Sequence, residues 1–141
     1  MAISPVPDTG HGASVTFGTT SWSGKLTGIP TNINETREPV STVYLGTTSA
    51  ETFMAGDVPK QGRVEFDVQF DSVNGLPATT TATETITITF PLPGGSAAVA
   101  ASAAFSGLIV GRTFPPLQTG VLQMGKIVVQ PSGNITWTAA T

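Results

Sequence analysis

An all-β fold is predicted by three features of the sequence. Residues 63–71 and residues 84–90 both alternate between apolar and polar side chains, which is typical of strands with one buried and one wet face. The chain holds 16 Gly and 11 Pro and only 11% charged residues, and this composition favours strands and turns over helices. We therefore expect a sandwich or half-open barrel of about seven or eight mostly antiparallel strands, with at most one short helix.

Length and composition indicate one domain and exclude several classes of function. The 141 residues suit a single domain, in which roughly two thirds of the unfolded chain's surface can be buried. Without Cys there is no disulfide framework and no thiolate chemistry. The net charge is −3 and the six basic residues are dispersed, which argues against a site that grips nucleic acid through its phosphates. Neither a secretory signal nor a membrane-spanning stretch is recognisable, so we expect a protein made in a cytoplasm and no membrane partner.

The N-terminal part is predicted to hold a flexible arm followed by two short strands. Residues 1–12 contain Pro, Gly and the only His, and such a terminus is flexible unless something holds it. Residues 13–18 and 22–29 are predicted to be strands. Their expected core anchors are Trp22, Leu26 and Ile29.

Residues 30–62 are predicted to form one long loop within a single β domain of residues 13–141. The only regular element expected in this loop is a short strand at Val40–Leu45. Loops of this length are uncommon in compact domains and are usually functional or disordered. Disorder is not expected, because the loop carries apolar residues, namely Ile33, Val40, Tyr44, Leu45, Phe53, Met54 and Val58. We expect inter-subunit contacts here, with Tyr44, Phe53 and Met54 as anchors.

The two alternating segments are the strongest predicted strands, and we expect them to pair antiparallel with each other. The apolar faces are Val64, Phe66, Val68 and Phe70 on one strand and Ile86, Ile88 and Phe90 on the other. The polar faces are Arg63, Glu65, Asp67, Gln69 and Asp71 on one strand and Thr85, Thr87 and Thr89 on the other.

The C-terminal part is predicted to add further strands. Residues 97–104 are rich in Ala and fit either a short helix or a strand of small residues. Residues 105–110 are predicted to be a strand and residues 111–120 a Pro-containing loop. Residues 124–130 and 134–138 are expected to form a hairpin around a short Pro-Ser-Gly turn.

No arrangement of residues indicates catalysis or a bound cofactor. His11 is the only histidine and lies in the arm, where we expect it to be solvated and without the third group of a catalytic triad. Glu65, Asp67 and Asp71 share one strand face, but consecutive same-face positions are about 7 Å apart, too far for one metal ion. These carboxylates could pair as in a glycosidase, yet no aromatic platform for a sugar accompanies them. We therefore expect a protein that is not an enzyme and has no metal or other cofactor.

A series of short motifs runs through residues 36–71 and again near the end of the sequence. It consists of Arg37-Glu38, Val40, Thr42, Leu45-Gly46, Phe53, Gly56-Asp57 and Gly62, followed by the strand that ends in Phe70-Asp71. It continues with Phe105-Ser106-Gly107 and with the closing run from Met124 to Trp137. In their order and spacing these motifs resemble the tail tube (major tail) proteins of long, non-contractile-tailed bacteriophages.

The resemblance implies a structural virion protein that self-assembles into stacked hexameric rings in the host cytoplasm. DNA would pass through the lumen of the tube without specific binding, and other tail proteins would close the tube ends. We expect the polar strand faces to line the lumen as an acidic, hydroxyl-rich wall that repels phosphate. The predicted lumen residues are Glu65, Asp67, Gln69, Thr85, Thr87 and Thr89. In the N-terminal arm, Ile3 and Val6 are expected to contact a neighbouring ring.

Two other classes of protein fit the same composition. One is a capsid decoration protein or another virion β-domain, and the other is a carbohydrate-binding β-sandwich module. Aromatic side chains on a wet face would favour the carbohydrate-binding module, and the polar faces of the two strongest strands carry none. Electron microscopy of the purified protein separates the three, because only a tail tube protein would form tubes.

Overall fold

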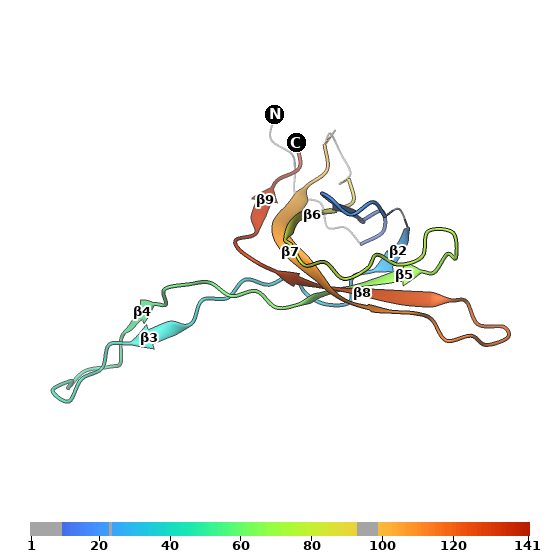
Figure 1. The fold of residues 1–141 in the computed structure, drawn as a ribbon. Helices are drawn as coiled ribbons and strands as arrows, with labels where there is room; N and C mark the ends of the chain where they lie inside the picture. The colour runs from blue at the N-terminus through green and yellow to red at the C-terminus, as the bar shows by residue number, and fades with distance from the viewer. Residues whose placement is uncertain (1–9, 23, 93–98) are drawn as a thin grey trace.

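The fold is all-β, as predicted, and is drawn in Figure 1. A computed structural model describes residues 10–22, 24–92 and 99–141, which hold nine strands and no helix. The strands are β1 (Ser14–Phe17), β2 (Lys25–Gly28), β3 (Pro39–Ser41), β4 (Phe53–Ala55), β5 (Val64–Gln69), β6 (Glu84–Thr89), β7 (Ser102–Thr113), β8 (Met124–Pro131) and β9 (Thr136–Thr138).

One antiparallel sheet makes up the body of the molecule. Its strand order is β1-β6-β7-β8-β5-β2, with β9 paired to β7, while β3 and β4 form a separate two-stranded sheet. β7 has 12 residues, and its register with β8 shifts between Ile109 and Gly111, a bulge that bends the strand. β7 curves strongly in Figure 1, so that the sheet wraps around its own apolar face in the manner of a half-open barrel.

The hydrophobic core lies on one face of this curved sheet. Val64, Phe66 and Val68 of β5 and Ile86 and Ile88 of β6 are fully buried, as predicted. Phe70 and Phe90, at the ends of the two predicted inward faces, are only partly buried. β7 and β8 complete the core with Ala103, Phe105, Ile109, Ile127 and Val129. The three anchors expected around β2 are partly buried and pack against the core: Trp22, Leu26 and Ile29.

The predicted pairing of the two strongest strands is wrong. β5 pairs with β8 and β2, whereas β6 pairs with β1 and β7, so two strands separate them. The connection between β5 and β6 crosses the core instead of forming a tight turn. It buries Leu76 in the core, and its Thr80 N–H donates to the Ile109 carbonyl. The alternation of side chains predicts which face of each strand is buried but not which strand pairs with it.

The predicted C-terminal hairpin is also wrong. β9 pairs with β7, with Thr138 opposite Ser102, instead of turning back on β8. β8 pairs with β7 as far as Pro131, which lies opposite Gly107, and β9 then continues along the same edge of β7 after a short break. The Ser132 N–H donates to the Ser106 carbonyl and holds the chain on that edge.

Two further expectations concern the ends of elements. The Ala-rich segment forms a strand from Ser102 onward, and this strand runs on to Thr113, into the segment expected to be a loop. Residues 97 and 98 lie outside the described residues. Of the predicted N-terminal arm, residues 1–9 also lie outside them, while Gly10 to Ala13 form a turn closed by a hydrogen bond of 3.2 Å.

Candidate functional site: a polar sheet face and a projecting arm

The face of the sheet opposite the core is mainly polar, with Ala104, Leu108 and Val128 as apolar positions on β7 and β8. Strand register places residues that face each other across a ladder on the same side of the sheet. Thr85 lies opposite Ser106 and Asp67 opposite Lys126, and neither pair belongs to the buried set. The six residues predicted to line a lumen all lie on this face: Glu65, Asp67, Gln69, Thr85, Thr87 and Thr89.

The polar face has a hydroxyl-rich part and a charged part. The hydroxyl-rich part is built by β1, β6 and the first half of β7, and it carries Ser14, Thr16, Thr85, Thr87, Thr89, Ser102 and Ser106. The charged part is built by β2, β5 and β8, and it carries Lys25, Glu65, Asp67, Lys126 and Gln130. Sequence reasoning found the carboxylates but missed both lysines.

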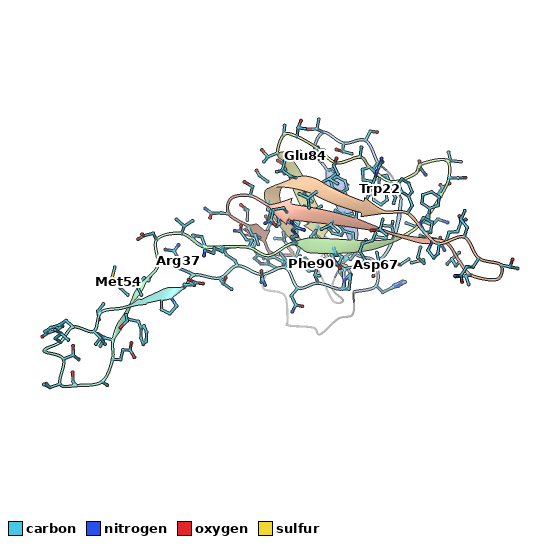
Figure 2. All side chains as sticks on the ribbon, turned by 60° about the horizontal axis from the view of Figure 1, so that its bottom comes forward. Trp22, Arg37, Met54, Asp67, Glu84 and Phe90 are labelled. Carbon is cyan, nitrogen blue, oxygen red and sulfur yellow. The ribbon has the colours of Figure 1, made fainter. Side chains whose placement is uncertain are left out.

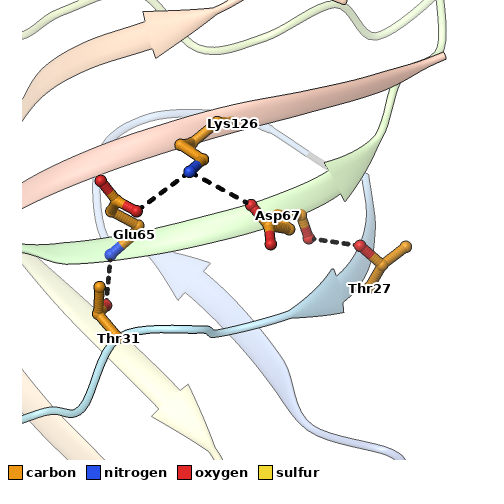
Figure 3. Close-up of polar contacts among 5 residues, drawn as sticks. All are labelled: Thr27, Thr31, Glu65, Asp67 and Lys126. Atoms are coloured by element: carbon orange, nitrogen blue, oxygen red, sulfur yellow. Dashed lines mark hydrogen bonds and ion pairs between the residues drawn. The ribbon is translucent and has the colours of Figure 1, made fainter.

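Lys126 lies between two carboxylates in the charged part, as Figure 3 shows. Its Nζ is 3.1 Å from Glu65 Oε2 and 4.0 Å from Asp67 Oδ1. The three side chains are between a third and two fifths exposed, so the pairing is screened by water and stabilises the fold only weakly. Its main effect is on the surface, where it neutralises the lysine.

The charge of this face differs from the expected acidic wall. On the strands of the polar face, Glu65 and Asp67 are balanced by Lys25 and Lys126. Gln69, opposite Lys25, carries no charge. The wall is therefore neutral in sum, with one of its two lysines held in an ion pair. The sequence does contain a signal that Lys126 lies on the polar face, because this residue alternates with the buried Ile127 and Val129 along β8.

Hydroxyl groups fix the segment that borders the charged part (Figure 3). Thr27 Oγ1 donates to the Asp67 carbonyl at 3.0 Å, and the Glu65 N–H donates to Thr31 Oγ1 at 2.8 Å. Both bonds tie the chain from β2 onward to β5. The carboxylates of Glu65 and Asp67 thus rise from a strand whose backbone is held on both sides.

The long segment predicted as a loop is a β-hairpin, called the arm below and comprising residues 36–60. Thr36 and Lys60 form a β-bridge at its base, with backbone hydrogen bonds of 2.8 and 2.6 Å. β3 and β4 pair further out, and the Thr42 N–H donates to the Thr52 carbonyl at 3.0 Å. In Figures 1 and 2 the arm projects well beyond the sheet that forms the core. The predicted strand at Val40–Leu45 is shorter, at Pro39–Ser41, because the hairpin opens beyond Thr42.

A glycine allows the two sides of the arm to approach closely. A Cβ at Gly56 would lie 2.3 Å from the Glu38 carbonyl oxygen, which is far inside contact distance. The Arg37 guanidinium donates to the Gly56 carbonyl at 3.0 Å across the same position. Gly56 is thus required by the close backbone approach and not by an unusual backbone angle.

The arm exposes large apolar side chains on both of its sides. The predicted anchors Tyr44, Phe53 and Met54 are 72%, 58% and 55% exposed. Their exposed apolar neighbours in the arm are Val40, Val43, Leu45 and Val58. Ile33, which precedes the arm, packs against the core instead. The other two predicted contact residues, Ile3 and Val6, lie outside the described residues.

A second exposed apolar surface lies at the connection between β7 and β8, and we call it the tip. Its exposed members are Phe114, Leu117, Val121 and Leu122, and Val73 is also exposed in the neighbouring connection after β5. From Thr113 to Gly125 the chain carries no charged residue. In Figures 1 and 2 the β7–β8 connection extends from the end of the molecule opposite the arm.

A groove of about 1150 Å³ lies at the open side of the half-barrel. It is lined mainly by apolar and hydroxyl side chains, among them Leu26, Ile33, Phe90 and Trp137. The Trp137 and Phe90 rings meet edge to face, 5.1 Å apart at 62°. Among its described lining residues the exposed His11 is the one titratable side chain.

The described residues offer neither a cluster of metal ligands nor a helix that could span a membrane. Within residues 10–22, 24–92 and 99–141, no cluster of three or more His, Cys, Asp or Glu could hold a metal ion. The same residues contain no helix long and apolar enough to span a bilayer.

Comparison with known proteins gives a likeness of fold. No family model and no curated protein matches the chain. Among cryo-EM structures, a chain of the sheath/tube terminator of the PVC extracellular contractile injection system, in its extended state, is similar with a TM-score of 0.70. The identity is 11%, and the match covers 96% of this chain and 99% of that one.

Two further structures from assemblies of this kind are similar. A chain of the PVC sheath–tube complex in its extended state matches with a TM-score of 0.63 and 12% identity, covering 94% of this chain and 92% of that one. A chain of the anti-feeding prophage (AFP) baseplate, a 6-fold symmetrised structure, matches with a TM-score of 0.61 and 10% identity, covering 96% and 98%. This chain therefore has the fold of proteins found in phage-tail-like injection systems, over nearly their whole length.

Proposed function

We propose that this protein is a structural subunit of a phage-tail-like tube, built from stacked rings of identical copies. The likeness of fold supports it, because the similar chains come from a sheath–tube complex, a sheath/tube terminator and a baseplate. The order of motifs over residues 36–71, which resembles phage tail tube proteins, supports it independently.

The observation that carries the proposal is the arm. A monomer in water would leave Tyr44, Phe53 and Met54 largely exposed on a hairpin that projects away from its own core. Contiguous exposed apolar surface of this kind marks protein–protein contact sites. Fully burying one such side chain contributes about 1.5–3 kcal/mol, so a few of them can hold a neighbouring subunit.

Ring formation accounts for the edges of the sheet. β1 and β2 are the outer strands of the main sheet, each with one partner strand among the described residues. Unpaired edges invite pairing with another chain, and a closed ring covers them. We propose six copies per ring, which is supported by the 6-fold symmetry of the similar AFP baseplate structure.

In the proposed tube the polar face lines the lumen and DNA passes along it without being held. The wall would offer hydroxyls and a lysine whose charge Glu65 and Asp67 neutralise. Since Lys126 is held in its ion pairs, Lys25 is the main cation that the strands of this wall would present to phosphate. One such cation per copy gives little affinity for nucleic acid, which depends mainly on the number of phosphates neutralised. The sequence resemblance favours a long non-contractile tail, whereas two of the similar structures belong to an extracellular contractile injection system. The proposed role as a tube subunit is the same in a non-contractile and in a contractile tail.

The proposal extends to partners and location. Other tail proteins would bind at the tube ends, and the tube would be assembled in the host cytoplasm as part of a virion tail. The N-terminal arm, with Ile3 and Val6, would contact a neighbouring ring. Deleting residues 2–8 should then slow tube formation. Unchanged kinetics would show that the hairpin of residues 36–60 and the sheet edges suffice for tube formation without the N-terminal segment.

Sedimentation and electron microscopy of the purified chain test the proposal. We expect fast-sedimenting tubes of constant diameter with a regular axial repeat. A capsid decoration protein would stay in small, closed oligomers, and a carbohydrate-binding module would stay monomeric. Small closed oligomers or monomers at every concentration tested would contradict the proposal.

A further inference from the structure

We propose that the tip of one copy receives the arm of a second copy. This inference rests on the proposed function and identifies the surface on which the arm docks. The receiving surface comprises Phe114, Leu117, Val121 and Leu122. Leu117, at 79%, is among its most exposed members.

The tip is held in place by the body of the protein, which a receiving surface requires. The Phe70 N–H donates to the Gln123 carbonyl at 2.9 Å, and the Phe70 and Phe114 rings meet edge to face 6.0 Å apart. The Arg112 guanidinium lies 5.1 Å from the centre of the Phe114 ring and donates to the Leu76 carbonyl at 3.2 Å. These contacts fix the base of the connection and leave its apolar side chains facing water.

Charge selects the tip over a second arm as the partner. Between Ser41 and Met54, the outer part of the arm, the single charged residue is Glu51. Two arms that met at their outer ends would bring two copies of this carboxylate together. The β7–β8 connection has no acidic residue between Thr113 and Gly125, and Arg112 stands at its base. An arm on the tip thus places an acidic apolar hairpin beside an uncharged apolar surface with a cation at its border.

The positions of the two surfaces favour a head-to-tail contact. The arm and the tip lie at opposite ends of the molecule in both Figure 1 and Figure 2, so one copy cannot join its own arm to its own tip. Each copy therefore donates one arm and receives one. A contact between two different surfaces of identical copies generates rings or open stacks, which is the arrangement a tube needs.

The absence of Cys from the sequence permits a clean cross-linking test. Two full-length single-cysteine variants are prepared, Phe53→Cys in the arm and Leu117→Cys at the tip, one of them with a mass tag. They are mixed under assembly conditions and treated with a short bifunctional thiol reagent. We expect the mixed Phe53→Cys and Leu117→Cys product in several-fold excess over that of a control pair, Phe53→Cys with Thr16→Cys, whose cysteine lies on exposed β1 of the polar face.

The outcomes separate this inference from the proposed function. Tubes that form without the mixed product, or with products joining two Phe53→Cys copies only, would overturn the arm–tip contact and leave the tube intact. A wild-type chain that forms no tubes would overturn both. A charge exchange gives a second readout: Glu51→Arg should slow assembly several-fold, and Glu51→Arg with Gln118→Glu should restore part of the rate, because Gln118 is an exposed, uncharged residue of the tip and its replacement leaves the contacts of Arg112 in place. A double variant as slow as the sum of its single variants would contradict the contact.

Discussion

The Thr20 hydroxyl donates to the buried carboxylate of Glu84 at 2.8 Å and so joins the loop after β1 to the first residue of β6. The same carboxylate accepts the backbone N–H groups of Thr19 and Thr20 at 3.2 and 2.9 Å. Glu84 is 8% exposed, and among the described residues it is the buried charged side chain. Its three hydrogen bonds compensate for the loss of water around the charge.

The first prediction follows from this carboxylate. Glu84→Ala removes all three hydrogen bonds and should lower the free energy of unfolding by about 1.5–3 kcal/mol, as measured by urea denaturation. Thr85→Ala, on the exposed side of the same strand, is the control and should change stability by less than about 0.5 kcal/mol. Equal effects of the two substitutions would show that Glu84 has no special role in holding the loop.

The second prediction separates assembly from folding. Phe53→Ala should leave the free energy of unfolding within about 0.5 kcal/mol of wild type, because the ring is exposed on the arm. It should nevertheless slow tube formation. Phe66→Ala empties a fully buried core position and should cost about 3–5 kcal/mol. Loss of the circular dichroism spectrum in Phe53→Ala would instead identify Phe53 as part of the core.

The third prediction concerns the shape of the arm. Gly56→Ala introduces a Cβ that would clash with the Glu38 carbonyl, so the arm must distort at that point. We expect unchanged thermal unfolding of the sheet together with slower assembly, measured by light scattering. Gly111→Ala, within β7, where a Cβ makes only ordinary contacts with Val128, should leave assembly at its wild-type rate. Wild-type assembly of Gly56→Ala would show that the detailed form of the arm is unimportant.

The fourth prediction concerns the wall of the proposed lumen. Glu65→Gln with Asp67→Asn leaves Lys126 without its ion-pair partners. Tubes of this variant should retain DNA at low salt and release it as salt rises, whereas wild-type tubes should not retain it. Adding Lys126→Gln should abolish the retention. DNA that binds wild-type and variant tubes equally in a co-sedimentation assay would contradict the role given to the ion pair.

The sequence was sufficient to predict what depends on local alternation. Phe66 and Ile88 were expected to be buried, and they are fully buried, because a strand with one dry face must place every second side chain inward. The common polar face of Glu65 and Thr87 follows from the same periodicity. The partner of each strand could not be predicted, since β5 and β6 carry the same pattern and Leu76, in the connection between them, gave no signal of its burial.

The arm and the lysines of the polar face were harder to predict, for different reasons. A hairpin exposed on both sides has no alternation, so Val40 and Met54 pair across β3 and β4 without any periodic signal. Lys126 lies in an alternating segment of the sequence, but its ion pairing depends on Asp67 opposite it. That register is set by the whole sheet. At the tip the sequence predicts only a Pro-containing loop, because the exposure of its apolar side chains depends on the three-dimensional structure.

A cryo-EM reconstruction of tubes assembled from the purified chain tests the central claim most directly. The account predicts stacked rings in which the side chains of Glu65, Asp67 and Thr87 face the lumen and the arm of each copy contacts another copy. A regular tube with those three side chains on its outer wall, or with the arm free in solvent, would contradict it.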